Sequence, residues 1–117
     1  MKKQNRICEA AFEFALRIVR LHQFFSDSSV KPITTQLLRS GTSIGAMTRE
    51  AQYAESRSDF IHKMKIALKE ANETQYWLEL LFKSENLNEK QFNSLNSDLL
   101  EILKLLTSIV NTAKTNY

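Results

Sequence analysis

The sequence predicts an all-α fold, an up-down-up-down antiparallel four-helix bundle that uses residues 1–117 as a single domain. The chain has only two glycines and one proline, the residues that interrupt helices most strongly. Apolar residues recur at alternating steps of four and three in four segments, and no segment alternates strictly as a half-buried strand would. Short polar connections join segments of similar length, which makes neighbouring helices antiparallel. We place the helices near residues 4–26, 32–55, 58–84 and 89–115.

The first two helices flank a polar turn that contains the proline. The first helix carries an apolar stripe made of Ile7, Ala11, Phe14, Ile18, Leu21 and Phe25. The second begins beside Pro32, which is tolerated there because the N–H groups of a first helical turn lack intrahelical partners. Its stripe is rich in small residues and comprises Ile33, Leu37, Ser40, Ile44, Met47, Ala51 and Ala54.

The last two helices start at capping sequences. Ser56 and Asp59 have the spacing of a capping box, and Asn88 and Gln91 repeat that spacing before the fourth helix. No glycine or proline interrupts either helix. The third stripe comprises Phe60, Met64, Ala67, Ala71, Thr74, Leu78 and Leu81. The fourth comprises Phe92, Leu95, Leu99, Ile102, Leu106, Ile109 and Ala113.

Both glycines lie inside the second predicted helix. Each costs about 1 kcal/mol relative to alanine in a helix interior, and Gly41 and Gly45, four residues apart, share one face. We therefore expect another helix to pack too closely for larger side chains, and leucine at either position to disrupt packing or assembly. The face assigned to helix or subunit packing comprises Leu38, Gly41, Gly45 and Thr48. Apolar and small surface beyond the needs of one interior also predicts self-association.

Positive charge is concentrated in the first part of the chain. The net charge is +3, and residues 1–69 hold 12 Lys/Arg against 6 Asp/Glu, whereas residues 70–117 hold 4 against 7. A basic half can contact phosphates, form a solvated face, or attract the acidic half of the same molecule. Basic and aromatic residues do not alternate as in single-strand-binding proteins. The candidate nucleic-acid contacts are Lys2, Lys3, Arg6, Arg17, Arg20, Lys63, Lys65 and Lys69.

Catalytic and metal-binding patterns are weak. A di-metal bundle needs two Glu-x-x-His pairs and two further carboxylates, whereas the chain offers only Asp59-x-x-His62 at a helix start. Cys8 lies near the core stripe and is expected to be a small buried hydrophobic residue rather than a nucleophile. We predict no enzyme, no metal and no cofactor. Carboxylates at the edge of the core are expected to pair with Arg or Lys of a neighbouring helix rather than to catalyse a reaction. The residues assigned to this core-edge polar pairing are Arg39, Glu50, Glu70 and Glu73.

Targeting signals are likewise weak. No apolar run approaches the roughly 18 residues that cross a bilayer. The basic N-terminus continues into an amphipathic segment interrupted by Glu9 and Glu13, unlike a signal peptide. The single cysteine fits a reduced compartment, so we expect a cytoplasmic protein without a membrane partner or a small-molecule substrate.

Several segments resemble the 23S rRNA-intervening sequence protein family of bacteria, most strongly between Leu37 and Leu81. They are Arg39-Ser40, Ser43-Ile44-Gly45-Ala46, Glu50, Ser58-x-Phe60, Ile66-Ala67-Leu68-Lys69-Glu70-Ala71-x-Glu73-Thr74 and Tyr76-Trp77-Leu78. One departure is that a glycine often follows the glutamate in the family, whereas Ala51 follows Glu50 here. The resemblance implies a four-helix bundle that assembles into a homopentamer, and it implies no catalytic residues. A similar protein accompanies diversity-generating retroelements and binds nucleic acid and the reverse transcriptase through a basic surface.

Three hypotheses follow. The first is a non-enzymatic homo-oligomeric bundle, pentameric by resemblance, that associates with RNA or with a nucleic-acid-processing protein. The second is a structural or protein-partner adaptor with no nucleic-acid role. The third and weakest is a metal-dependent enzyme that would use Glu50, Glu70, Glu73 and His62.

Overall fold

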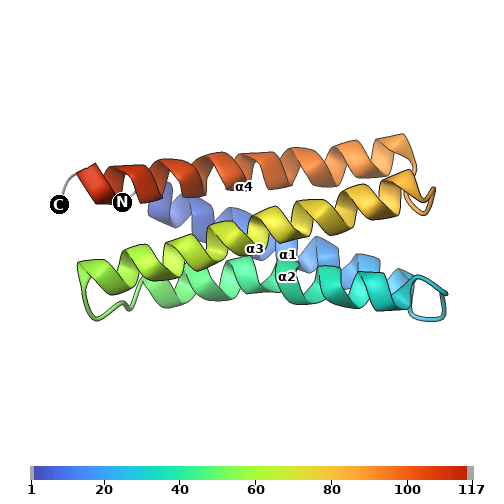
Figure 1. Ribbon diagram of the computed structural model, residues 1–117, viewed down its shortest axis with the longest axis horizontal. Coiled ribbons are helices and arrows are strands. Elements are labelled where there is room, and N and C mark those ends of the chain that lie inside the picture. Colours follow the sequence, from blue (N-terminus) through green and yellow to red (C-terminus); the bar gives the residue numbers. More distant parts are fainter. Residues whose placement is uncertain (1, 116–117) are drawn as a thin grey trace.

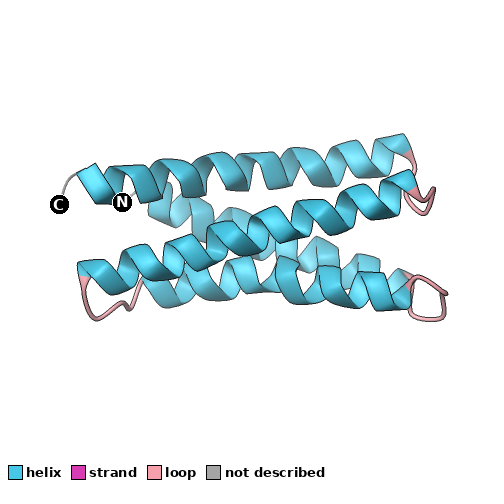
Figure 2. Cartoon of the chain, viewed as in Figure 1, coloured by secondary structure: helices cyan, strands magenta, loops and turns pink. Residues whose placement is uncertain are grey.

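The computed structural model describes residues 2–115 and shows four long α-helices packed side by side (Figures 1 and 2). They are α1 (Lys2–Phe24), α2 (Lys31–Ala51), α3 (Arg57–Lys83) and α4 (Glu89–Thr115). Each helix contacts the two that neighbour it around the bundle, so α1 lies diagonally across from α3, and α2 from α4. The predicted antiparallel four-helix bundle is confirmed. Within residues 2–115, no helix is long and apolar enough to cross a membrane.

The four predicted stripes meet in one apolar interior. Phe14, Ile44, Leu78 and Ile102, one from each helix, are at most 1% exposed. Most other stripe residues are buried as well, whereas Ile33, Met47, Phe60 and Phe92 pack half-buried at its edge. Burial of each large side chain contributes about 1.5–3 kcal/mol, so this interior is the main source of the fold's stability.

Side chains cap the starts of α3 and α4. The Ser56 hydroxyl accepts a hydrogen bond from the Asp59 N–H at 3.0 Å, and the Asp59 carboxylate accepts one from the Glu55 N–H at 3.2 Å. Asn88 and Gln91 form a reciprocal capping box with bonds of 2.8 and 2.9 Å. These bonds satisfy N–H groups that the helices themselves leave without partners, which explains why both helices begin where the sequence predicts.

Two helices end earlier than predicted. α1 ends at Phe24 and α2 ends at Ala51, whereas we expected them to continue to residues 26 and 55. After α2, the N–H groups of residues 52–54 bond to carbonyls three residues back, at 2.9–3.2 Å. The chain therefore tightens into a turn, and Ala54 keeps its half-buried position although it lies outside the helix.

The small face of α2 packs on α1 of the same chain. A Cβ at Gly41 would lie 3.2 Å from both γ carbons of Ile18, a distance that real Cβ contacts rarely reach. A Cβ at Gly45 would lie 3.6 Å from the Ala11 carbonyl oxygen, which is an ordinary contact. The close approach that we predicted from the two glycines therefore occurs at Gly41 and involves a helix within the subunit.

Candidate functional site

Two arginines of α1 predicted as phosphate contacts are paired with carboxylates of α4. Arg6 donates to Glu101 from Nη2 at 2.7 Å and from Nε at 3.0 Å. Arg17 donates from Nη1 to Asp98 at 2.6 Å. These pairs join the basic and acidic parts of the sequence, so intramolecular attraction accounts for part of its charge asymmetry.

The basic residues of α3 lie apart from those of α1. Lys63 lies 3.6 Å from a Glu50 oxygen and 3.7 Å from an Asp59 oxygen. Lys65 makes no ion pair within residues 2–115, and Lys69 is close enough to Glu73 to help lower the pKa of its carboxyl. Because α3 is diagonal to α1, the structure does not gather the eight predicted contacts into one patch.

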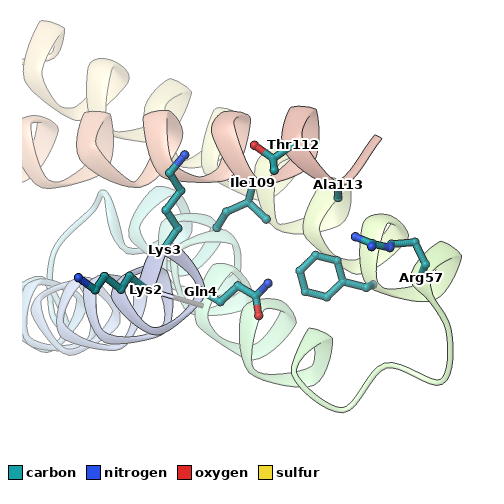
Figure 3. Close-up of a pocket in the computed structure, with 8 residues that line it drawn as sticks. Lys2, Lys3, Gln4, Arg57, Ile109, Thr112 and Ala113 are labelled. Atoms are coloured by element: carbon teal, nitrogen blue, oxygen red, sulfur yellow. The ribbon is translucent and has the colours of Figure 1, made fainter. Parts of the chain in front are cut away.

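Positive charge surrounds a pocket of about 310 Å³ at the end of the bundle where α1 and α3 begin and α4 ends (Figure 3). Lys2, Lys3 and Arg57 lie at its rim, and Ile109 and Ala113 supply apolar surface within it (Figure 3). The Lys3 ammonium donates to the Ser108 hydroxyl at 2.5 Å, which directs it toward α4. Lys3 therefore helps to hold the first turn of α1 against the last turns of α4.

A second groove lies where α1 ends and α4 begins, and it combines basic and aromatic residues. It has a volume of about 330 Å³, and its lining residues include Arg17, Arg20 and Phe24. The Phe24 ring is 78% exposed and meets the Phe25 ring edge-on, with 5.1 Å between centroids. Arg20 is exposed and makes no ion pair within the described part of the chain. The groove therefore offers a cation and a flat ring to one ligand.

This groove brings two arginines and one aromatic residue together, although basic and aromatic residues do not alternate along the chain. Arg17, Arg20 and Phe24 follow one another at steps of three and four, which places them on one side of a helix. The signal was present in the sequence. Phe24 was overlooked because it neighbours Phe25, which belongs to the core stripe and is only 8% exposed.

Three of the core-edge polar residues, Arg39, Glu70 and Glu73, form a network between α2 and α3, whereas Glu50 lies 3.6 Å from Lys63. Arg39 donates from Nη1 to Glu70 at 2.9 Å and from Nη2 to Glu73. The Trp77 indole N–H donates to the same Glu73 oxygen at 2.9 Å. Beneath them, the fully buried hydroxyls of Ser40 and Thr74 are 2.9 Å apart. The segments that carry the family resemblance thus meet here and tie α2 to α3.

The hydrogen bond from Trp77, followed by that from Arg39, lowers the pKa of the Glu73 carboxyl below its usual range. A depressed pKa stabilises the fold above the ordinary carboxyl pKa, near 4.3, and this contribution is lost as the pH falls through the folded-state value. We predict that Glu73→Gln flattens the dependence of unfolding free energy on pH between about 5 and 3. Since the pair is partly exposed, the effect should stay below about 1 kcal/mol.

Urea unfolding at several pH values checks this prediction. Glu79→Gln is the matched control, because Glu79 is an exposed carboxylate of the same helix with no ion pair in the described structure. If both variants change the pH dependence equally, the Trp77 and Arg39 contacts do not stabilise the Glu73 carboxylate.

The carboxylates considered for a metal site form ion pairs with basic side chains. Glu70 and Glu73 bind Arg39 at the α2–α3 edge, and Glu50 lies near Lys63. His62 is exposed. Within residues 2–115, no three His, Cys, Asp or Glu side chains converge as a metal ion would require. The arrangement therefore supports ion pairing between helices.

Comparison with known proteins agrees with the sequence resemblance. Residues 3–108 match the model of the family described as 23S rRNA-intervening sequence protein. The chain is also similar to a crystal structure from Bacteroides thetaiotaomicron, described as a protein with unknown function from the S23 ribosomal protein family. The two share 52% identity and a TM-score of 0.89, over 93% of this chain and 98% of the other. A search of curated proteins finds no match.

Proposed function

Because the chain belongs to the 23S rRNA-intervening sequence protein family, we propose that it is a non-enzymatic homo-oligomeric bundle that associates with RNA. The resemblance implies a pentamer. The observation that supports RNA association most directly is the groove at the end of α1, where Arg20 and Phe24 lie together. We place RNA binding there rather than on the whole basic surface, since Arg6 and Lys63 are already paired with carboxylates.

The chemistry of this groove suits a single-stranded segment. An exposed aromatic ring offers a stacking surface to any base, and such stacking contributes about 1–3 kcal/mol per base. An arginine without a carboxylate partner can contact a phosphate and release condensed counterions, which makes binding salt-dependent. Arg17 lies beside these two residues, and its ion pair with Asp98 reduces the charge that it offers. Repetition of the groove around an oligomer would strengthen weak individual contacts.

We predict that Arg20→Glu and Phe24→Ala each weaken binding of a single-stranded RNA about tenfold at low salt. Tenfold corresponds to about 1.4 kcal/mol, within the range for one stacked base. Arg20→Glu should also reduce the slope of log K against log salt by about 1, because one phosphate contact is lost. Electrophoretic shift or fluorescence anisotropy across a salt series measures both quantities.

The matched control is Lys104→Glu, which changes the net charge equally at an exposed position of α4 outside the groove. Arg20 is preferable to Arg17 for this test, because reversal at Arg17 would also break the pair with Asp98. If the unaltered protein shows no detectable RNA binding at low salt, the proposal is contradicted. So would an equal loss of affinity in Lys104→Glu and Arg20→Glu. The adaptor hypothesis, with a protein partner and no nucleic-acid role, would then be favoured.

A further inference from the structure

Two neighbouring hollows lie at the end of the bundle where α1 and α3 begin. The pocket of about 310 Å³ described above meets a second hollow of about 340 Å³, which extends over the turn between α2 and α3. Gln4, Arg57 and Phe60 line both of them. A cavity of roughly 150 Å³ holds a benzene-sized group, so the first pocket alone has room for a small organic molecule.

The charge around these two hollows has one sign. Of the described residues that line either of them, the charged ones are Lys2, Lys3 and Arg57, and none is a carboxylate. A smaller hollow further along α1 and α4 differs, because one arginine and three carboxylates line it. An anion at the end of the bundle therefore meets only attractive charges among the lining residues.

Two of the three cations reach toward the pocket, whereas the Lys2 side chain points away from it (Figure 3). Lys3 extends from α1 toward α4, and the Ser108 hydroxyl that accepts its hydrogen bond is neutral, so the ammonium charge is not cancelled. Arg57 reaches in from α3 (Figure 3). Its guanidinium has five N–H donors in a planar fork that matches a carboxylate, and the Gln4 amide offers two further donors.

Apolar side chains line the same pocket. Ile109 and Ala113 are one turn apart on α4 and are 5% and 4% exposed, and the half-buried Phe60 contributes from α3. A hydrocarbon chain that covers these residues leaves water, which favours binding in proportion to the area covered. Ligand sites typically combine such a surface with a few polar groups that fix the orientation of the ligand.

We propose that this end of the bundle binds a small organic carboxylate. Its hydrocarbon part lies on Ile109 and Ala113, and its carboxylate lies between Lys3 and Arg57. Three helices build the site, and α1 and α3 are diagonal in the bundle, so the ligand joins two helices that are not neighbours. The site lies at the opposite end of α1 from the groove assigned to RNA, and the inference does not rest on the proposed function.

Isothermal titration calorimetry with sodium octanoate, below the concentration at which it forms micelles, tests the proposal. Octanoate should bind about tenfold more tightly than hexanoate, because each buried CH₂ group strengthens binding about fourfold at most. Octanol and inorganic phosphate should each bind about tenfold more weakly than octanoate or not at all, since each lacks one half of the ligand. Octanoate should also raise the midpoint of thermal unfolding, because the site exists only in the folded bundle.

Two variants with matched controls locate the site. Thr112→Trp places a large ring at the pocket and should weaken octanoate binding about tenfold, whereas Asn111→Trp, at the preceding exposed position of α4, should not. Lys3→Gln should weaken binding about fivefold, a modest loss because Lys3 is exposed. Its control is Lys104→Gln, which removes the same charge from an exposed position of α4 outside the pocket. Circular dichroism should show unchanged helix content in all four variants.

Three other outcomes would overturn the assignment. Octanoate that gives neither heat nor a higher unfolding midpoint at millimolar concentration would show that the pocket takes no such ligand. Equal affinity for octanoate, hexanoate and phosphate would reduce the site to a general attraction for anions. Equal losses in Thr112→Trp and Asn111→Trp, or in Lys3→Gln and Lys104→Gln, would place octanoate elsewhere on the bundle.

Discussion

Gly41→Leu should lower the free energy of unfolding by about 3 kcal/mol, at the upper end of the cost of overpacking a core. A Cβ at this position already lies 3.2 Å from both γ carbons of Ile18, and leucine adds three more carbons to the same space. Ile18 is fully buried, so its side chain has no solvent to move into. The strain must instead separate α1 from α2. Urea unfolding at a fixed protein concentration measures the loss.

Gly45→Ala is the matched control, four residues further along the same face. Its Cβ would lie 3.6 Å from the Ala11 carbonyl oxygen, so the methyl group fits without movement. Since alanine favours a helix over glycine by about 1 kcal/mol, this variant should be as stable as the parent or slightly more stable. A destabilised Gly45→Ala, or an unaffected Gly41→Leu, would contradict the close contact at Gly41. The two glycines therefore differ in the room that they leave for a Cβ, although leucine was expected to disrupt packing or assembly at either position.

Phe14→Ala should cost about 3–5 kcal/mol, the usual range for removing a fully buried aromatic ring. Phe14 is 1% exposed and belongs to the continuous apolar core. The four long helices leave little freedom for the backbone to collapse into the space, because each is held by two neighbours. A domain of this size has a total stability of about 5–15 kcal/mol, so the variant would be marginal at 37 °C. Thermal unfolding followed by circular dichroism would show the midpoint lowered by 10 °C or more, at roughly 4 °C per kcal/mol.

Phe24→Ala removes the same ring from the same helix at a position that is 78% exposed. It should change the free energy of unfolding by only about 0.5 kcal/mol, because an exposed ring gains little from the fold. The pair of variants thus separates the two roles of phenylalanine on α1. Similar losses in Phe14→Ala and Phe24→Ala would mean that α1 does not face the interior as described. Phe24→Ala is then also the stable variant needed to test RNA binding.

Much of the fold follows from local patterns in the sequence. Most residues of the stripes that begin at Ile7 in α1 and at Phe92 in α4 are buried as predicted, because a helix repeats its inward side every three or four residues. The starts of α3 and α4 were predicted from capping residues, whose bonds span only three positions. The predicted ends of α1 and α2 were less accurate, since the backbone hydrogen bonds that tighten a last turn require no particular residue types.

The candidate site was less predictable. The pairing of Arg6 with Glu101 joins residues 95 positions apart, and no spacing rule relates them. For the same reason the sequence showed that Gly41 required a close neighbour but not that Ile18 would supply it. Phe24 could have been assigned with Arg20 from spacing alone, but its exposure became evident only with Phe25 in the core.

By itself, the sequence determined an antiparallel bundle of four helices, their inward sides and the family, because these depend on periodicity, caps and short motifs. The tertiary structure decided which charges are paired, which glycine is tightly packed, and where a pocket combines basic and apolar residues. Those features depend on distances between side chains of different helices, and such distances arise only when the helices are packed together.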